Sequence, residues 1–244
     1  MLIFLCPLQS RESAKNWKQV LGLCRATIKS ICAQTNKNFK VFLICNEDPG
    51  IGTNLPHVEV LTGAFPAPKT QHERMLDKYA KLNLGAYAAR SLAPSHFMKV
   101  DADDRVSNRL AQLVSDNPNS NGWFFEKGYL HQQNSRFVYL QSRFHTICGT
   151  SAIIRCTEED LPSSASRDES RFSLIHLGHH LTVESMRELN RPLEPLPFPG
   201  AMYEIGTGEN WTGISYKSWP GFSAFLKRSM AIRFKTKKIC DEFS

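Results

Sequence analysis

The sequence lacks the cysteine spacing of a disulfide framework or a zinc site. Its seven cysteines are an odd number, and no two of them stand in a C-x-x-C arrangement. Cys6 and Cys45 lie inside apolar, strand-like runs, where a thiol packs as a small hydrophobic group. We therefore expect a reduced, cytoplasmic chain without structural disulfides or a structural zinc ion.

The sequence also lacks a long hydrophobic run. No stretch approaches the roughly 18 apolar residues that suggest a membrane-spanning helix. The apolar segment at residues 1–8 is too short for a secretory signal, and no basic residues precede it. We expect a protein that is either soluble or peripheral to a membrane.

Acidic residues are fewer than basic ones, with 23 Asp and Glu against 30 Lys and Arg, and the formal net charge is +7. A positive surplus suits a phosphate-bearing ligand, nucleic acid or an anionic membrane surface, and it does not choose among them. An ordinary basic surface without a partner is the alternative. Because the basic residues are scattered except near the C-terminus, a nucleic-acid binder is the less favoured class.

The first hundred residues alternate between short apolar runs and helical patterns. The runs at 2–8, 39–45, 57–63 and 96–100 predict buried strands. Between them, residues 17–34 and 76–94 repeat apolar side chains at three- and four-residue steps, as one face of a helix does. This order predicts an α/β fold with a mostly parallel sheet and helices on both faces. In such sheets, ligands bind at the carboxyl ends of the strands.

The second half of the chain is less regular. Residues 122–132 and 136–142 predict β-strands around a turn, and residues 147–156 predict another strand. Residues 174–190 predict a helix. We find no internal repeat and no change of composition sharp enough to mark a domain boundary.

Three carboxylates gather directly after the predicted strand at 96–100. Asp101 and Asp103 are two residues apart, so in an extended chain they project to the same face. Adjacent carboxylates repel each other unless a cation lies between them. Oxygen ligands suit Mg²⁺ or Mn²⁺, which bridge to substrate phosphates. The cluster therefore predicts half of a site for a metal and a diphosphate; an acidic turn before the next helix is the alternative.

At this point the sequence resembles the GT-A glycosyltransferases, especially their family-2-like members, over about residues 1–190. The D-x-D strand and the helix after it give the most specific match. The matching segments, in order, are "LIFLCPLQSRES", "FKVFLICNEDP", "KLNLGAYAARS", "MKVDADDRVSNRLAQLV", "ICGTSAIIR" and "LGHHLTVESMREL". The resemblance implies a GT-A fold with a smaller antiparallel part on the acceptor side. Residues 1–221 would form one catalytic domain, with a nucleotide-binding half at 1–110 and an acceptor half at 111–221.

The resemblance also implies roles for individual residues. It implies a nucleotide-sugar donor linked to UDP, GDP or dTDP, a Mn²⁺ or Mg²⁺ ion, and inverting transfer of a hexose-like sugar to a hydroxyl of a carbohydrate or glycolipid acceptor. Asp103 would bind the metal, and Asp101 would contact the ribose or the metal and its water. The remaining donor contacts would be Pro7 and Leu8 at the base pocket, Glu47 or Asp48 reading the base, and Lys78 or Lys81 at the phosphates. Asp104 would cap the next helix, and Lys99 would turn its ammonium group toward solvent.

The catalytic base departs from the family pattern. Family members place Asp where this chain has His180, next to His179. A histidine with a pKa near about 6.5 removes a proton from a hydroxyl at neutral pH, so His180 is the first candidate. Glu184, one helical turn further on, is the substitute. His176 and His180, spaced to share one helix face, are the alternative of a metal site, and a polar helix surface is the third possibility.

Two later segments extend the hypothesis. Residues 203–213 are glycine-rich, and Glu209, Asn210 or Trp211 would reach a metal, a phosphate or a sugar there; a surface turn is the alternative. Residues 222–244 form a basic tail whose apolar residues, from Phe222 to Phe234, recur at helical spacings. Such a segment suits the anionic inner face of a membrane, and the alternative is a surface helix packed on the catalytic domain.

Three other functions compete with a metal-dependent glycosyltransferase. A catalytically degenerate GT-A-like protein that only binds a nucleotide sugar would explain the missing Asp base. A nucleotidyltransferase also uses an α/β sheet and a metal, but it needs a glycine-rich loop, and residues 6–17 contain no glycine. A nucleic-acid binder leaves the carboxylate cluster unexplained.

Overall fold

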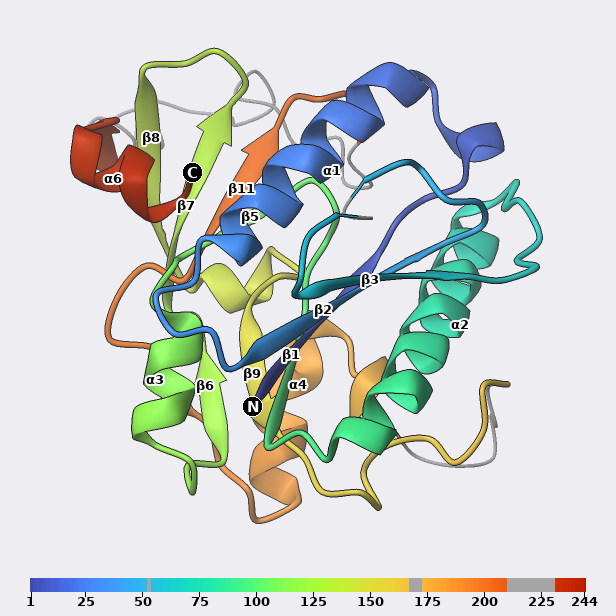
Figure 1. The fold of residues 1–244 in the computed structure, drawn as a ribbon. Helices are drawn as coiled ribbons and strands as arrows, with labels where there is room; N and C mark the ends of the chain where they lie inside the picture. Colours follow the sequence, from blue (N-terminus) through green and yellow to red (C-terminus); the bar gives the residue numbers. More distant parts are fainter. Residues whose placement is uncertain (52–53, 167–172, 210–230) are drawn as a thin grey trace.

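A seven-stranded sheet forms the centre of the molecule (Figure 1). The computed structural model describes residues 1–51, 54–166, 173–209 and 231–244. The strand order is β10-β6-β9-β4-β1-β2-β3. These strands are β1 (Leu2–Pro7), β2 (Phe39–Cys45), β3 (Val58–Thr62), β4 (His96–Lys99), β6 (Gly122–Phe124), β9 (Ala152–Arg155) and β10 (Glu194–Pro195). Only β9 runs antiparallel to its neighbours among these described strands, so the predicted mostly parallel sheet is confirmed.

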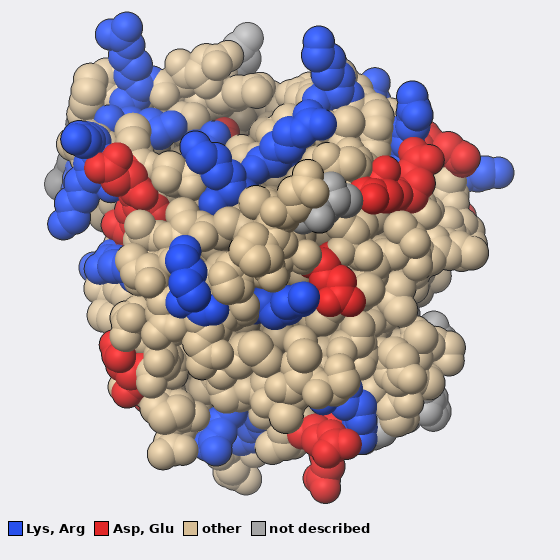
Figure 2. All heavy atoms as spheres, viewed as in Figure 1, with Lys and Arg blue, Asp and Glu red and all other residues tan. Residues whose placement is uncertain are grey.

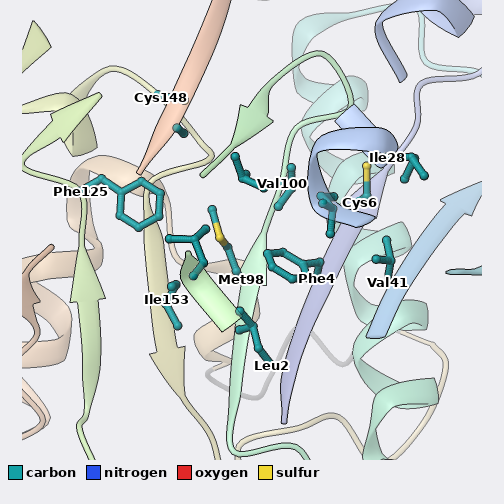
Figure 3. Packing of buried hydrophobic residues seen from close by; sticks show 14 of the residues in the cluster. Leu2, Phe4, Cys6, Ile28, Val41, Met98, Val100, Phe125, Cys148 and Ile153 are labelled. Carbon is teal, nitrogen blue, oxygen red and sulfur yellow. The ribbon is translucent and has the colours of Figure 1, made fainter. Parts of the chain in front are cut away.

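Helices cover both faces of this sheet. Because successive side chains of a strand point to opposite faces, Leu2, Phe4 and Cys6 of β1 pack in the same cluster as residues of α1, whereas Ile3 and Leu5 pack with residues of α2 (Figure 3). The helices are α1 (Trp17–Cys32), α2 (Gln71–Ala89), α3 (Leu110–Asp116), α4 (His179–Glu188) and α6 (Lys237–Glu242). Short 3₁₀ turns are η1 (Arg11–Ser13), η2 (Arg90–Leu92), η3 (Phe144–Thr146) and η4 (Leu174–His176).

A second, five-stranded sheet carries the strands of the less regular half. Its order is β12-β8-β7-β11-β5. The strands are β5 (Arg105–Val106), β7 (Lys127–Gln132), β8 (Phe137–Ser142), β11 (Ala201–Ile205) and β12 (Ile232–Phe234). The pairing is antiparallel except between β7 and β11. This sheet is the smaller, mainly antiparallel part that the family resemblance implied.

The predicted strand over 122–132 is in fact two strands. β6 pairs with β9 and β10 in the large sheet, whereas β7 pairs with β8 and β11 in the small one. The chain changes sheets at Phe125, which is fully buried, and its N–H donates to the Ser151 carbonyl at 2.8 Å. The alternation of apolar and polar side chains continues where the chain passes from one sheet to the other, so the sequence pattern does not show where β6 ends and β7 begins.

Two helical predictions need correction. Residues 174–190 do not form one helix, because η4 ends at His176 and α4 begins at His179. The helical spacing read through Phe234 is wrong for residues 232–234, which form the edge strand β12 paired with β8. Residues 222–230 of the tail lie outside the described residues. Within the part of the chain that the structure describes, no helix is both long and apolar enough to cross a membrane.

Candidate functional site

A cavity of about 450 Å³ opens at the carboxyl ends of β1 and β4, where ligands bind in this class of sheet. The loop after β1 forms one wall, α2 forms a second, and the turn before α4 forms a third. The cavity brings together seven of the residues singled out in the sequence: Pro7, Leu8, Lys78, Asp101, Asp103, His179 and His180. They come from four segments of the chain that are far apart in sequence.

Asp101 lies at the centre of this arrangement. Its backbone N–H donates to Thr150 Oγ1 at 2.9 Å, and its carboxylate accepts a hydrogen bond from the Lys78 ammonium group of α2. Burial works against charging the Asp101 carboxyl, but the charge and hydrogen bond of Lys78, together with the charges of His179 and Lys99, outweigh it and lower the pKa of Asp101. Asp101 is therefore an anion already paired with a cation. A Cβ atom at Gly149 would lie 2.4 Å from Asp101 Oδ2, so a side chain at position 149 would force the Asp101 carboxylate to move.

Asp103 has the opposite electrostatic environment. Burial, and then the negative charge of Asp101, raise the pKa of Asp103 to about 7. A divalent cation between the two carboxylates would relieve this repulsion, and oxygen ligands suit Mg²⁺ or Mn²⁺. The donor set thus fits half of a metal site. Among the described residues, no group of three His, Cys, Asp or Glu side chains is arranged to hold a metal ion.

The prediction that Asp104 caps the next helix is wrong. Arg109 occupies the N-cap position of α3, and Asp104 is fully buried beside the carboxylate pair. Its Oδ2 accepts a hydrogen bond from Cys148 Sγ at 3.2 Å. Burial, followed by the charges of Asp103 and Asp101, raises the pKa of Asp104 well above its ordinary value. Asp104 therefore belongs to the interior that supports the cavity.

The prediction that Lys99 points to solvent is also wrong. Lys99 lines the cavity, and its ammonium group donates a hydrogen bond to the Leu177 carbonyl. Burial, and then the like charge of Lys78, lower the pKa of Lys99 to about 7. The sequence pattern did not reveal the position of the Lys99 side chain. β4 ends at Lys99, and the side chain lies in the cavity, which a local strand pattern does not indicate.

The two histidines differ in their surroundings. His179 is partly buried, and burial lowers the pKa of its imidazole while the Asp101 charge opposes this shift. His180 lines the same cavity but is exposed, so it lies on the open side. His176 sits in η4, where its ring contacts Tyr79 with centroids 5.2 Å apart. His176 and His180 therefore do not share a helix face, which removes the basis of the proposed histidine metal site.

Four other predicted residues lie away from the cavity lining. Glu184 is exposed on α4 and forms an ion pair with Arg187. Lys81 is fully buried and donates to the Leu8 carbonyl and to Asp77 Oδ2, both at 2.8 Å. Lys81 therefore fixes the loop after β1. Glu47 and Asp48, in the turn after β2, are not among the described residues that line the cavity.

Glu209 joins the second half of the chain to the loop after β1 and the start of α1. Its carboxylate accepts hydrogen bonds from Asn16 N at 2.7 Å and from Lys15 N and Gln9 Nε2 at 3.2 Å. Lys15 and Asn16 lie at the start of α1, where the helix dipole favours an anion, and Gln9 lies in the loop after β1. Asn210 and Trp211 lie outside the described residues. Gln9 and Tyr203 also line the cavity; both lie in segments noted in the sequence, but neither was singled out as a site residue.

Searches against known proteins identify the fold. No family model matches the chain, and neither does any curated protein. Among solved structures, S. aureus TarS residues 1–349 in complex with UDP-GlcNAc aligns with a TM-score of 0.51 at 13% identity, covering 88% of this chain and 61% of that one. TarS is a family-2-like GT-A glycosyltransferase. The fold is the GT-A fold.

Other matches agree less closely. A second structure of S. aureus TarS 1-349 aligns with a TM-score of 0.48 at 12% identity, covering 83% of this chain and 60% of that one. This chain thus spans about three fifths of the TarS chains, which are 60% and 61% covered. At such low sequence identity, the likeness establishes the fold alone. The reaction has to be inferred from the residues that line the cavity.

Proposed function

We propose that this protein is a metal-dependent glycosyltransferase that moves a sugar from a nucleotide-sugar donor to an acceptor hydroxyl. The observation that carries the proposal is the Asp101–Asp103 pair with Lys78, which lies in the cavity at the carboxyl ends of β1 and β4 of a GT-A fold. Such a cavity contains both signs of charge that a metal–diphosphate pair requires.

Asp101 and Asp103 would hold Mn²⁺ or Mg²⁺, which when bound neutralises the charge of a nucleoside diphosphate leaving group. Lys78 reaches the same place from α2 and would donate to a phosphate oxygen. Pro7 and Leu8 would border the nucleoside, and Lys81 holds the Leu8 carbonyl in place from behind. The complex of TarS with UDP-GlcNAc makes a UDP sugar the first donor to test, ahead of GDP and dTDP sugars.

His180 is our candidate for the general base. It lies on the exposed side of the cavity, where a carbohydrate or glycolipid acceptor can approach, and a neutral imidazole accepts a hydroxyl proton near neutral pH. His179 lies deeper and interacts with Asp101, so it would orient the donor side. A base on the face opposite the leaving group is the arrangement of an inverting transfer.

We extend the proposal to attachment at an anionic membrane surface. Ile232, Arg233 and Phe234 of β12 are all exposed, and Lys235, Lys237 and Lys238 follow them. Figure 2 shows basic side chains gathered over the part of the surface that α6 occupies. Exposed aromatic and basic side chains together favour an anionic lipid interface.

Binding and turnover measurements test the proposal. Calorimetry with UDP, GDP and dTDP sugars, each with Mn²⁺, Mg²⁺ or EDTA, should show binding of one nucleotide class that depends on the metal. Equal nucleotide affinity with and without metal would remove the metal from the proposal. A protein that binds a nucleotide sugar but neither transfers nor hydrolyses it would be the degenerate member that the two histidines in place of the Asp base suggest.

A further inference from the structure

Lys99 is the last residue of β4, two positions before Asp101. Its side chain lies on the same face of the strand as Phe97, which packs in the cluster that contains residues of α2 and η4. From that face the ammonium group reaches the Leu177 carbonyl. The hydrogen bond therefore joins the strand that carries the carboxylates to the segment that carries the histidines.

A lysine is a costly choice at this position. Phe97 on the same face is buried and Lys99 is partly buried, so an apolar residue at 99 would extend that face without taking a charge partly out of water. A residue that departs from the local packing pattern at a cost in stability is expected at functional sites.

The Leu177 carbonyl, which accepts this hydrogen bond, lies in the connection between η4 and α4. Leu177 and Gly178 connect η4 to α4, and Gly178 is the N-cap of α4 without a side-chain cap. His179 and His180 follow directly. On the η4 side, the ring contact between Tyr79 and His176 holds the segment against α2. On the α4 side, the bond from Lys99 holds the carbonyl just before the two histidines.

We infer that Lys99 is a positioning residue that fixes the histidine turn, residues 177–180, against the carboxylate strand so that both histidines face the cavity. The predicted effect of Lys99 on turnover rests on the proposed function. The predicted effect on the position of residues 177–180 does not. If the ammonium group is removed, the Leu177 carbonyl loses its partner and the turn gains freedom. The donor site on the β1 and α2 side keeps its contacts.

Amide hydrogen exchange of the full chain tests the structural part directly. Lys99→Met keeps most of the side-chain length and removes the donor, whereas Lys99→Arg keeps a donor. Lys40→Met is the matched control, because Lys40 is a strand lysine of β2 whose ion pair with Glu59, at 3.0 Å, lies away from the cavity. Exchange in residues 174–182 should rise at least about tenfold in Lys99→Met, and Lys99→Arg and Lys40→Met should match the wild type. If Lys99→Met fails to fold, Lys99→Ala, which also lacks a donor, is measured with the same expectation.

Kinetics then separate positioning from ligand binding. Lys99→Met should lower kcat by about 10- to 100-fold, as loss of an orienting contact does, and should raise the donor KM by less than His179→Ala does, because the His179 side chain is still present. Lys99→Arg should recover most of the kcat. Unchanged exchange in 174–182, or a loss confined to donor KM, would overturn the inference and make Lys99 a donor ligand or a packing residue. Absence of transfer by the wild type would overturn the proposed function alone, because the exchange result does not depend on it.

Discussion

Asp101 and Asp103 are two residues apart, and their surroundings shift the two carboxyl pKa values in opposite directions. The Lys78 ammonium group favours the Asp101 anion, whereas burial and the Asp101 charge favour a proton on Asp103. Ionised Asp101 would bind a cation directly. A bound cation would also favour loss of the proton from Asp103, which could then bind it. The predictions at the scale of single residues follow from this difference and from the environments of the histidines.

Asp103→Asn should abolish metal-dependent nucleotide binding and leave the fold intact. The substitution removes one of two carboxylates that would bind the metal, and it also removes a buried like-charge repulsion. Calorimetry with UDP and Mn²⁺ measures the first effect, and urea unfolding in EDTA measures the second, where the variant should be at least as stable as the wild type. Metal-dependent binding that survives in the variant would contradict the assignment of Asp103 as a ligand.

His180→Ala should lower turnover by about 10²- to 10⁴-fold, the usual contribution of a general base, with little change in donor affinity. His179→Ala should act mainly on donor affinity, because His179 interacts with Asp101. Initial rates over a range of donor concentrations separate the two effects. If His180→Ala retains near-normal turnover, another group is the base. Glu184 is then a poor substitute, since it is exposed and paired with Arg187.

His96 should make the fold sensitive to acid. It is fully buried, and burial lowers the pKa of its imidazole from 6.5 to about 4. Between these pH values the His96 imidazole is protonated in the unfolded chain but neutral in the folded chain. The free energy of unfolding should therefore fall as pH drops from about 6.5 to about 4. With about 1.4 kcal/mol for each unit of pKa, the loss is on the order of 3 kcal/mol.

Urea unfolding between pH 7.5 and pH 4.5 measures this loss. His96→Phe keeps a ring against Trp123, whose centroid lies 5.7 Å away, and removes the titrating group. The variant should be less stable at neutral pH, because the Ser120 carbonyl loses its partner, but it should show a smaller fall toward acid. An equal fall in both proteins would show that other groups control acid sensitivity.

At the scale of elements, the packing of α2 on β1 and β2 sets the position of Lys78 and Lys81. Gly85 of α2 is the point of closest approach. A Cβ atom there would lie 2.8 Å from Ile44 Cδ1 and 3.1 Å from Leu5 Cδ2. These distances are too short, so either the Ile44 and Leu5 side chains shift or the helix moves away from the sheet.

Gly85→Ala should therefore destabilise the protein by about 1–3 kcal/mol, the usual cost of overpacking a core. It should also weaken nucleotide binding, because Lys78 and Lys81 move with α2. Gly22→Ala on the exposed side of α1 is the matched control. No atom lies within 4 Å of a Cβ at Gly22, so alanine should stabilise the helix by about 0.5–1 kcal/mol. Urea unfolding decides the stability effects, and a neutral Gly85→Ala would mean that the helix has room to adjust.

At the scale of the whole molecule, the C-terminal segment is both part of the fold and a carrier of charge. Phe243 is 1% exposed, and Glu242 accepts hydrogen bonds from Ser107 at 2.6 Å and from Arg109 at 2.8 Å. In contrast, Phe234 is 59% exposed on the edge strand β12. Truncation would remove buried contacts together with the charges, so substitution of charges is the appropriate test of membrane attachment.

Reversal of charge at Lys235, Lys237 and Lys238 to Glu should reduce co-sedimentation with anionic vesicles at low salt. Each basic group near such a surface contributes about 1 kcal/mol, so the three substitutions remove a large share of the attraction. The control reverses Lys18, Arg25 and Lys29, which are exposed on α1. Equal losses in the two variants would assign binding to the net charge and not to the C-terminal segment. No sedimentation of the wild type would end the membrane proposal.

The sequence by itself determined the α/β class, the central parallel strands and the carboxylate cluster. β1, β2, β3 and β4 of the large sheet are short apolar runs, and α1 and α2 repeat apolar residues at helical steps, so their periods reveal them without tertiary information. Asp101 and Asp103 could be singled out because a strand end in such a sheet is where a ligand binds. His179 and His180 were found through the family resemblance, by their position in a motif.

Only the tertiary structure decided which side chains face the cavity. Lys99 and Phe97 are on the same face of β4, yet Lys99 lines the cavity and contacts the Leu177 carbonyl, whereas Phe97 packs in the core. The change of sheet at Phe125 and the strand β12 depend on partners far away in the chain, which a local period does not report. The same holds for Glu209, whose three donors lie in residues 9–16. Long-range contacts set the environment of a charged group, so they decide its role.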